Sequence, residues 1–356
     1  MKHVSDSTEL IEDKMTVKIN IIYGFVEGPW GGGNQFLKAL RDHLIKIGVY
    51  SERPEDADVI LFNSHHMLDD VISVKRQYPE KIMIHRVDGP IFYTRGRDME
   101  VDREIFRIND MLADGTVFQS KWSKEKNYRL GISESDYHTV IMNAPDGSIF
   151  NSNGKVPSSG GKTRIIATSW SDNLRKGFDI YQYLDEHLDF NRFDMTFVGN
   201  SPVGFKNIKW IRPVPDREIA RLLKEHDIYV TASRNDPCSN SLIEALHSGL
   251  PAVAASDGGH PEIVGEAGEL FDGSEDVIEA IEKVAEGYDH YRSKISMPAM
   301  DMIANRYYSF AQKIYDDTVN GKYVPKRLAW SALAAYRLGI AKKSLKDRIR
   351  SLHAKR

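Results

Sequence analysis

Strand-like and helix-like segments alternate along most of this sequence, and that alternation limits the fold more than any other feature. The strand-like runs Val17–Tyr23 and Val59–Phe62 flank a stretch, Phe36–Ile45, in which apolar residues recur every three or four positions. Further strand-like runs in this half are Lys81–Val87, Gly115–Gln119 and His138–Met142. Such alternation favours a parallel β-sheet with helices on both faces.

A segment rich in Gly, Pro, Ser and Asn, residues 146–162, interrupts this pattern, and we interpret it as a linker between two domains. The alternation then resumes, with strand-like runs at Arg164–Thr168, Phe193–Val198, Ile208–Ile211, Ile228–Thr231 and Ala252–Ala255. We therefore expect an α/β protein with two tandem doubly wound, Rossmann-like domains. A ligand should bind in the cleft where the carboxyl ends of the two sheets face each other.

The expected division of the chain has five parts. They are a polar extension (1–15), a first Rossmann-like domain (16–145), the linker (146–162), a second Rossmann-like domain (163–305) and C-terminal helices (306–356) that cross back to the first domain. A chain of 356 residues with 41% apolar residues can bury a core in each of two domains.

The composition excludes several classes of protein. With 48 basic and 51 acidic residues the chain is close to neutral, which disfavours a general nucleic-acid binder. Its single cysteine, Cys238, excludes an intramolecular disulfide and a cysteine-based zinc site. The N-terminus lacks the apolar core of a signal peptide, and no apolar stretch is long enough to span a bilayer. These features together favour the cytoplasm.

The C-terminal segment carries an unusual charge. From residue 320 onward there are eleven Lys and Arg residues and a single acidic one, Asp347. Residues 328–356 also repeat apolar side chains at helical spacing. The segment is either a helix packed on the N-terminal domain or a basic amphipathic helix that lies peripherally on the inner face of an anionic membrane.

A glycine-rich loop follows the first strand-like run and ends at Gly32 and Gly33, directly before a helix. Such a loop can bring backbone N–H groups to a phosphate, or it can simply form a tight turn. As a dinucleotide-binding fingerprint it is incomplete, because Phe36 occupies the position of the third glycine.

Polar residues follow three strand-like runs of the first half, where a doubly wound sheet presents its chemistry. They include His65, Arg86, Asp88 and Ser120, and we expect these four to line the cleft. The adjacent pair formed by His65 and its neighbour lacks the spacing of a zinc site, so we expect no metal. His85 lies inside an apolar run, which is typical of a hydrogen-bonded core histidine.

In the second half, Arg175 and Lys176 lie between a strand-like run and a helix. Paired cations there can neutralise a pyrophosphate leaving group, or they can form a solvated basic turn. Further along, Asp236 lies in a loop, Ser239 or Asn240 is a natural N-cap, and Glu244 lies one turn into the next helix. That helix N-terminus can hold a diphosphate, and Glu244 can reach a ribose.

Taken together, these residues resemble the family 4, or group 1, glycosyltransferases of the GT-B fold. Asp236 and Glu244 keep the spacing of the family's two signature acids. Gly249 and Pro251 follow at the family's positions, and residues 258–264 match its Gly-Gly…Glu-Ile-Val segment. The resemblance covers about residues 17–271 and is strongest from residue 164 on.

The resemblance implies a role for each site residue. The donor nucleotide and diphosphate would be bound by Gly32, Gly33, Arg175, Lys176, Ser239, Asn240, Ser241, Leu242 and Glu244. The donor sugar would contact Asp236, Gly258, Gly259 and His260. Asp236, Lys176 and Asp88 would be the catalytic residues. Residues 16–145 would form the acceptor-side domain, with Asp88, His65, Arg86 and Ser120 on the acceptor side, and residues 163–305 the nucleotide-sugar-binding domain.

This sequence departs from the family pattern in three places. The first signature acid is aspartate rather than glutamate, and the strand-tip histidine is replaced by Asp88. The arginine that usually accompanies the lysine is replaced by Trp170 or Ser171, so Arg175 would have to substitute for it.

The implied reaction is transfer of a hexose from a UDP- or GDP-linked sugar to a hydroxyl of a glycan or lipid-linked glycan, with retention at the anomeric carbon. No cofactor, no metal and no nucleophilic protein intermediate is implied. The alternatives are a sugar-nucleotide 2-epimerase of the same fold, a non-catalytic scaffold that binds sugar nucleotides and, more remotely, an NAD dehydrogenase.

Overall fold

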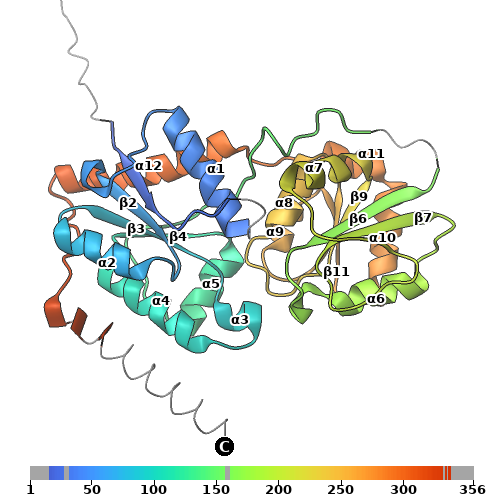
Figure 1. The fold of residues 1–356 in the computed structure, drawn as a ribbon, viewed down its shortest axis with the longest axis horizontal. Helices are drawn as coiled ribbons and strands as arrows, with labels where there is room; N and C mark the ends of the chain where they lie inside the picture. Colours follow the sequence, from blue (N-terminus) through green and yellow to red (C-terminus); the bar gives the residue numbers. More distant parts are fainter. Residues whose placement is uncertain (1–15, 28–31, 157–160, 332, 335, 338–356) are drawn as a thin grey trace, which may run out of the picture.

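The computed structural model describes residues 16–27, 32–156, 161–331, 333, 334, 336 and 337, and these form two α/β domains side by side (Figure 1). Each domain has a parallel β-sheet covered by helices on both faces. The predicted fold class is confirmed.

The N-terminal sheet has five strands in the order β1-β2-β3-β4-β5. Their bounds are β1 (Ile19–Ile22), β2 (Val59–Asn63), β3 (Ile82–Val87), β4 (Gly115–Phe118) and β5 (His138–Val140). Tyr50 forms a single parallel bridge with Ile19 on the outer side of β1. After β1 the chain first pairs with one edge of this strand, at Tyr50, and then crosses to its other edge to form β2. A topological switch point therefore lies between β1 and β2.

Helices cover both faces of this sheet. One face is packed by α1 (Gly32–Lys46) and α12 (Met300–Val319), and the other by α2 (Leu68–Gln77) and α4 (Met99–Leu112). The remaining elements of this domain are η1 (Pro54–Asp56), α3 (Ile91–Arg95) and α5 (Lys121–Leu130). The side chains facing each layer are apolar and almost completely buried, which is what the periodicity of the sequence predicts.

The C-terminal sheet has six strands in the order β11-β10-β9-β6-β7-β8. Their bounds are β6 (Thr163–Ser169), β7 (Phe193–Gly199), β8 (Lys209–Ile211), β9 (Ile228–Thr231), β10 (Ala252–Ala255) and β11 (Gly268–Phe271). The first strand of this domain, β6, lies in the middle of the sheet, and the order reverses between β6 and β9. This is the strand order of a dinucleotide-binding doubly wound sheet.

The helices of this domain also form two layers. One face carries α6 (Phe178–His187) and α10 (Val277–Glu286), and the other carries α7 (Asp216–Glu225), α8 (Asn240–His247) and α9 (His260–Val264). The short helix η2 (Leu174–Lys176) precedes α6, and α11 (Tyr288–Ser293) follows α10.

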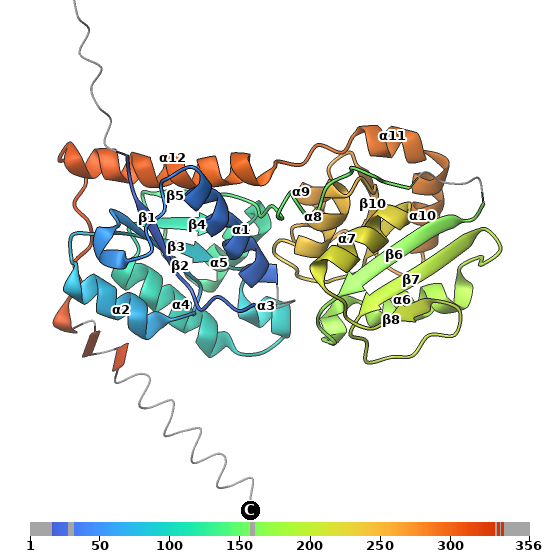
Figure 2. The same ribbon diagram turned by 45° about the horizontal axis from the view of Figure 1, so that its top comes forward.

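After α11 the chain returns to the N-terminal domain through α12, which lies along α1 (Figure 2). Beyond α12, Leu333 and Tyr336 are buried among residues of α2 and α4, and the Tyr336 hydroxyl donates a hydrogen bond to Glu104 at 2.9 Å. The described start of the basic segment is thus packed on the N-terminal domain. Residues 338–356, which carry most of the predicted membrane-binding face, lie outside the described residues.

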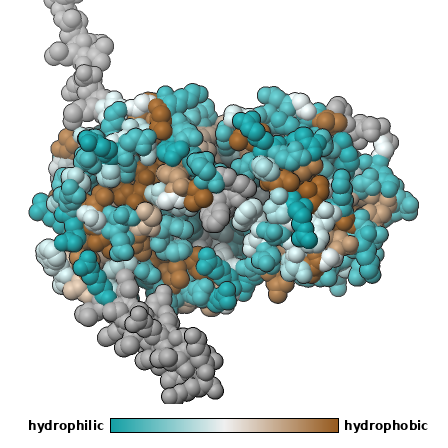
Figure 3. Space-filling model, viewed as in Figure 1, coloured by the Kyte–Doolittle hydropathy of each residue, from teal (hydrophilic) through white to brown (hydrophobic). Residues whose placement is uncertain are grey.

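Hydrophilic residues predominate on the face of the molecule shown in Figure 3, with smaller hydrophobic areas between them on both domains. Within the described residues, no helix is long and apolar enough to cross a bilayer.

Candidate active site

A cavity of about 440 Å³ lies between the two domains. On the N-terminal side it is lined by residues that follow β3 and β4, among them Asp88 and Gln119. On the C-terminal side Lys176, Asp236 and Glu244 line it. The carboxyl ends of both sheets therefore meet at one cavity, as the doubly wound pattern predicts.

Lys176 and Asp236 form an ion pair in this cavity, with 3.0 Å between Nζ and Oδ2. The side chain of Asn173 caps η2 by accepting a hydrogen bond from the Arg175 N–H at 3.0 Å, and this cap fixes the turn that carries Lys176. Burial alone would raise the pKa of Asp236. The neighbouring Lys176 and His260 outweigh burial and hold that pKa below its ordinary value, so Asp236 carries its negative charge at neutral pH.

The N-terminus of α8 points into the same cavity. Ser239 occupies its N-cap position but makes no capping hydrogen bond with its side chain, and Asn240 and Ser241 line the cavity beside it. The N–H groups of the first helical turn have no partner within the helix, and the helix dipole adds partial positive charge there. The position suits a phosphate group. Leu242, predicted to belong to this site, is buried in the domain core.

Glu244 lies one turn further along α8 and is partly buried at the cavity wall. Burial and the nearby carboxyl group of Asp216 raise the pKa of Glu244 to about 8. The pKa of Asp216 is likewise raised by burial. Glu244 is therefore largely protonated at neutral pH and can both donate a hydrogen bond to a ribose diol and accept one from it.

Asp216 lies beside Glu244, a proximity that the sequence did not reveal. It begins α7 after Pro215, so in the sequence it looks like an ordinary acid at a helix start. The fold places it at the junction of the active-site cavity and a second cavity of about 420 Å³, which is lined by α1, α7, α8 and residues 144–150. Only the packing of α7 on α8 could have shown this.

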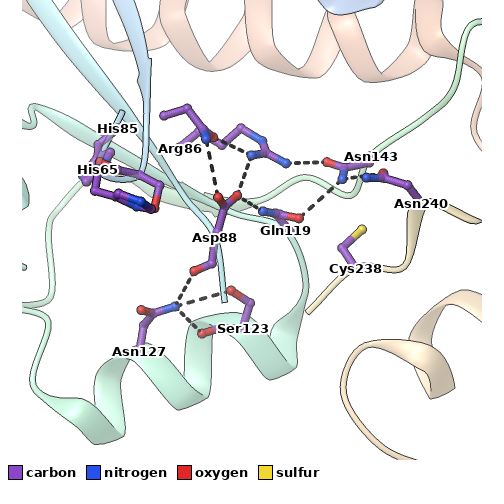
Figure 4. A network of polar contacts seen from close by, with 12 residues as sticks. His65, His85, Arg86, Asp88, Gln119, Ser123, Asn127, Asn143, Cys238 and Asn240 are labelled. Carbon is purple, nitrogen blue, oxygen red and sulfur yellow. Dashed lines mark hydrogen bonds and ion pairs between the residues drawn. The ribbon is translucent and has the colours of Figure 1, made fainter. Parts of the chain in front are cut away.

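On the N-terminal side, Asp88 belongs to a network of polar side chains (Figure 4). Its carboxylate accepts hydrogen bonds from Arg86 Nη1 at 2.7 Å, from Asn63 at 3.4 Å, and from Gln119. Its main-chain carbonyl accepts a hydrogen bond from Asn127 at 3.1 Å. These contacts hold the carboxylate at the cavity wall, where the sequence predicted an acceptor-side group.

Arg86 lies at the centre of this network and is completely buried. Besides Asp88 it donates hydrogen bonds to Asn63 at 2.5 Å and to Asn143 at 2.8 Å. Its guanidinium carbon lies 4.8 Å from the centre of the Phe36 ring in α1. Asn143 in turn donates to Asn240 across the cleft at 2.8 Å, so the network ends at the N-terminus of α8.

The histidines of this domain have structural surroundings. His85 is completely buried, stacks on Phe62 at 4.3 Å and hydrogen-bonds the Ser64 carbonyl at 3.0 Å, and burial lowers its pKa to about 4. This agrees with the prediction of a core histidine. His65 stacks on His66 at 4.6 Å and does not line the cavity. Within the described part of the chain, no three His, Cys, Asp or Glu side chains are grouped as metal ligands.

Gly32, at the start of α1, lines the cavity together with Gly33. Gly32 packs so closely against Asn240 that an added Cβ would lie 2.0 Å from the amide nitrogen of that side chain. A larger residue at this position would displace the Asn240 side chain where the two domains approach each other. The earlier part of the predicted loop, residues 28–31, lies outside the described residues.

Several predicted site residues lie away from the cavity. The side chain of Arg175 extends to Gly96 in the N-terminal domain, so in this structure it does not provide the second cation predicted for the diphosphate. Ser120 is buried and caps α5 by accepting a hydrogen bond from the Ser123 N–H at 2.9 Å. Its hydroxyl thus has a structural partner.

The predicted sugar-binding loop also lies behind the cavity wall. Gly258, with φ of +65°, packs against the main chain of Asp236, where an added Cβ would lie 2.2 Å from the carbonyl oxygen. The Gly259 N–H donates to the same carbonyl at 2.8 Å. His260 is completely buried, and one ring nitrogen contacts the Ala255 carbonyl at 3.1 Å. These residues position the Asp236 loop rather than line the cavity.

The comparisons with known proteins agree with this geometry. Residues 190–287 match the family model described as Glycosyl transferases group 1. Comparison with curated protein sequences gives no match.

Solved structures show the same fold. Anabaena HepE in complex with UDP-glucose has a TM-score of 0.60 and 15% identity, covering 85% of this chain and 100% of that one. Sucrose-phosphate synthase from Thermosynechococcus elongatus has a TM-score of 0.60 and 12% identity, covering 93% and 100%. The catalytic domain of starch synthase IV from Arabidopsis thaliana, bound to ADP and acarbose, has a TM-score of 0.64 and 8% identity, covering 85% and 99%. The two domains have the GT-B arrangement.

Proposed function

We propose that this protein is a retaining glycosyltransferase that moves a hexose from a UDP- or GDP-linked sugar to a hydroxyl group of a glycan or lipid-linked glycan. One observation carries the proposal. Lys176, the N-terminus of α8 and the carboxyl group of Glu244 line one cavity, and Asp88 faces them from the other domain. The match of residues 190–287 to group 1 glycosyl transferases supports it.

The C-terminal domain would bind the donor. In this proposal the diphosphate lies against the first turn of α8 and Lys176, and the ribose hydroxyls contact Glu244. The ammonium group of Lys176 acts on the pyrophosphate, whose negative charge grows as the glycosidic bond breaks. Asp236, held 3.0 Å from that ammonium, places a negative charge near the sugar, which becomes positively charged in the transition state.

The N-terminal domain would bind the acceptor. The Asp88 carboxylate is fixed by Arg86 and Gln119 and can accept a hydrogen bond from a neighbouring hydroxyl of the acceptor, which orients the attacking hydroxyl. As that hydroxyl attacks, its proton passes to the departing phosphate oxygen on the same face of the sugar, so the product keeps the anomeric configuration of the donor. Binding the two substrates on opposite walls brings the reacting atoms together without a covalent enzyme intermediate.

In this proposal no metal takes part, since Lys176 and the α8 dipole supply the positive charge. The protein would act in the cytoplasm. Its basic C-terminal segment would lie on the inner membrane face where the acceptor is lipid-linked.

The test is product analysis by NMR after incubation with UDP- and GDP-hexoses and a panel of saccharide acceptors. We expect a glycoside with the anomeric configuration of the donor. Inversion would contradict the retaining mechanism. A donor sugar epimerised at C2 without acceptor would indicate a 2-epimerase. Donor binding without transfer or hydrolysis would indicate a non-catalytic scaffold, an alternative that the orientation of Arg175 away from the cavity favours.

A further inference from the structure

Three aromatic side chains gather where α3 and α5 meet at the edge of the cleft. The rings of Phe92 and Tyr93 are 5.7 Å apart at 67°, and those of Tyr93 and Trp122 are 6.2 Å apart at 66°. Phe92 is 38% exposed, and the other two are partly exposed. We refer to Phe92, Tyr93 and Trp122 as the aromatic platform. The proposed chemistry at Lys176 and Asp236 does not use it.

The platform is surrounded by positive charge. The Lys126 ammonium lies 5.4 Å from the centre of the Tyr93 ring and 5.7 Å from that of Trp122. Residues 91–98 and 121–130 together contain six Lys or Arg and two acidic residues, in a chain whose net charge is −3. Asp98 partly neutralises Arg95 at 3.9 Å and Arg97 at 3.8 Å. Lys126 contacts the two rings and leaves its charge available to an anion.

The platform adjoins the active-site cavity through α3, although Phe92, Tyr93 and Trp122 do not themselves line that cavity. Ile91, Thr94 and Arg95, on the same short helix as Phe92 and Tyr93, line that cavity together with Asp88. A saccharide whose terminal hydroxyl reaches Asp88 would therefore leave the cavity past α3. In Figure 1, α3 lies on the side of the N-terminal domain that faces the C-terminal domain.

The platform is also fixed to the opposite domain. Glu262 of α9 accepts hydrogen bonds from the N–H groups of Lys121 and Trp122, both at 2.9 Å. This carboxylate caps α5 from across the cleft, because the first N–H groups of a helix have no partner within it. The main chain at Trp122 is therefore tied to the C-terminal domain.

These features match one class of ligand. A pyranose presents C–H groups on its ring faces and packs on aromatic rings, while its hydroxyl groups stay in water. Lysine and arginine beside the rings would attract a carboxylate or a phosphate. We propose that the aromatic platform, with Lys126 and Arg95, binds an acidic saccharide, which is the part of the acceptor beyond the sugar that receives the hexose. This inference rests on the proposed function and specifies its acceptor class.

The test is calorimetric titration of the full-length protein at low salt with trigalacturonate, with maltotriose phosphorylated at one O6, and with unmodified maltotriose. We expect at least one of the two acidic probes to bind about tenfold tighter than maltotriose. Tighter binding of trigalacturonate would identify a carboxylate as the recognised group, and tighter binding of the phosphorylated maltotriose would identify a phosphate. Equal affinity for all three probes, or no binding of any, would overturn the proposal.

Variants separate a saccharide site from general surface charge. Trp122→Ala should weaken binding of the acidic probe about tenfold, and Lys126→Gln should weaken it about fivefold. Trp122→Phe should weaken binding less than about threefold, because a ring is retained. Tyr93→Ala removes a ring without altering α5, and it should also weaken binding of the acidic probe. Trp330→Ala is a matched control, because Trp330 is also exposed, with Arg76 over its ring at 5.0 Å, but lies beside α2. Wild-type affinity in Trp122→Ala and Tyr93→Ala would contradict the assignment.

Titration of the same variants with UDP and GDP separates the two proposals. Nucleotide binding without preference for an acidic saccharide would overturn the platform and leave the transferase proposal intact. Binding of an acidic saccharide without any nucleotide binding would support the platform as a saccharide site and overturn the transferase proposal.

Discussion

The two domains share one cleft but present their polar groups to it in different ways. In the C-terminal domain Asp236 lies on a loop and Glu244 on the helix that follows it, so these two residues are close in sequence and line the same cavity. In the N-terminal domain Asp88 is held by Arg86, Gln119 and Asn63, which come from three different strands or strand ends. Part of the C-terminal side of the cleft is thus local in sequence, whereas the N-terminal network depends entirely on the folded sheet.

This difference has an energetic consequence. The Arg86–Asp88 pair is buried on its arginine side, whereas the Lys176–Asp236 pair lies at the cavity wall with the lysine about one-third exposed. A buried charge that loses its partners is costly, while a partly exposed one can be solvated. The acceptor side should therefore contribute more to stability and the donor side more to turnover.

The largest expected effect is on stability in the N-terminal domain. Arg86→Met removes the centre of the buried network and should lower the free energy of unfolding by about 3–5 kcal/mol. The matched control is Arg234→Met, which breaks the exposed ion pair with Asp179 in the other domain and should cost about 0–1 kcal/mol. Urea denaturation measures both. Equal losses of unfolding free energy in the two variants would show that the buried ion pair contributes no more to stability than the exposed one.

The next effect is on turnover at the C-terminal domain. Lys176→Ala should lower kcat by about 10²–10³-fold, because its charge acts mainly as the pyrophosphate departs. Donor affinity should fall much less. Steady-state kinetics and nucleotide titration separate the two, with Lys176→Arg as the charge-preserving control. Equal losses in kcat and affinity would reduce Lys176 to a simple binding residue.

A third effect concerns pH and the paired carboxyl groups of the donor side. The pKa of Glu244 is raised to about 8, so the folded protein binds a proton there that the unfolded chain releases near its ordinary pKa. The free energy of unfolding therefore falls as pH rises from about 4.5, the ordinary pKa, to about 8, the pKa in the folded protein. Above pH 8 it becomes constant. Between pH 6 and pH 9 the wild type should lose about 3 °C of Tm relative to Glu244→Gln.

The control for this prediction is Asp216→Asn, which removes the neighbouring carboxylate and should reduce the pH-dependent loss. Parallel curves for wild type and Glu244→Gln would show that Glu244 ionises in the folded protein as it does in the unfolded chain.

The smallest expected effect tests the link between the domains. Asn143 donates to Asn240 across the cleft at 2.8 Å. A double-mutant cycle with Asn143→Ala and Asn240→Ala should give a coupling energy of about 0.5–1.5 kcal/mol in urea denaturation. A cycle between Asn143 and the distant Asn191, an exposed residue before β7, is the control and should give none. Additive effects at Asn143 and Asn240 would show that the contact does not connect the domains.

The same contrast explains what the sequence could reveal. The bounds of β9 and β10 agree with the prediction, because both are short apolar runs between clear turn signals. Asp236 and Glu244 reach the cavity because one loop and one helix turn separate them. The spacing of these two residues in the sequence is therefore enough to predict that they line the same cavity.

Other parts of the site depend on packing between elements distant in the chain. The sequence could not show that α7 places Asp216 beside Glu244, or that Arg175 extends to Gly96. Gly258 looked free to approach a sugar, but its positive φ serves close contact with the Asp236 main chain. The strand β11 was also missed, since Gly268 and Glu269 leave only two apolar residues in Gly268–Phe271.

The central claim is that the cleft binds a nucleotide diphosphate sugar through the C-terminal domain. The most direct measurement is a thermal-shift screen with UDP, GDP, ADP, TDP and CMP and their common sugar conjugates, on wild type, Glu244→Ala and the control Glu286→Ala, an exposed residue at the end of α10. A ligand at a hundred times its Kd stabilises by about 2.7 kcal/mol. We predict that one diphosphate series raises Tm in wild type and in Glu286→Ala, and much less in Glu244→Ala. No shift with any nucleotide, or an equal shift in Glu244→Ala, would contradict the account.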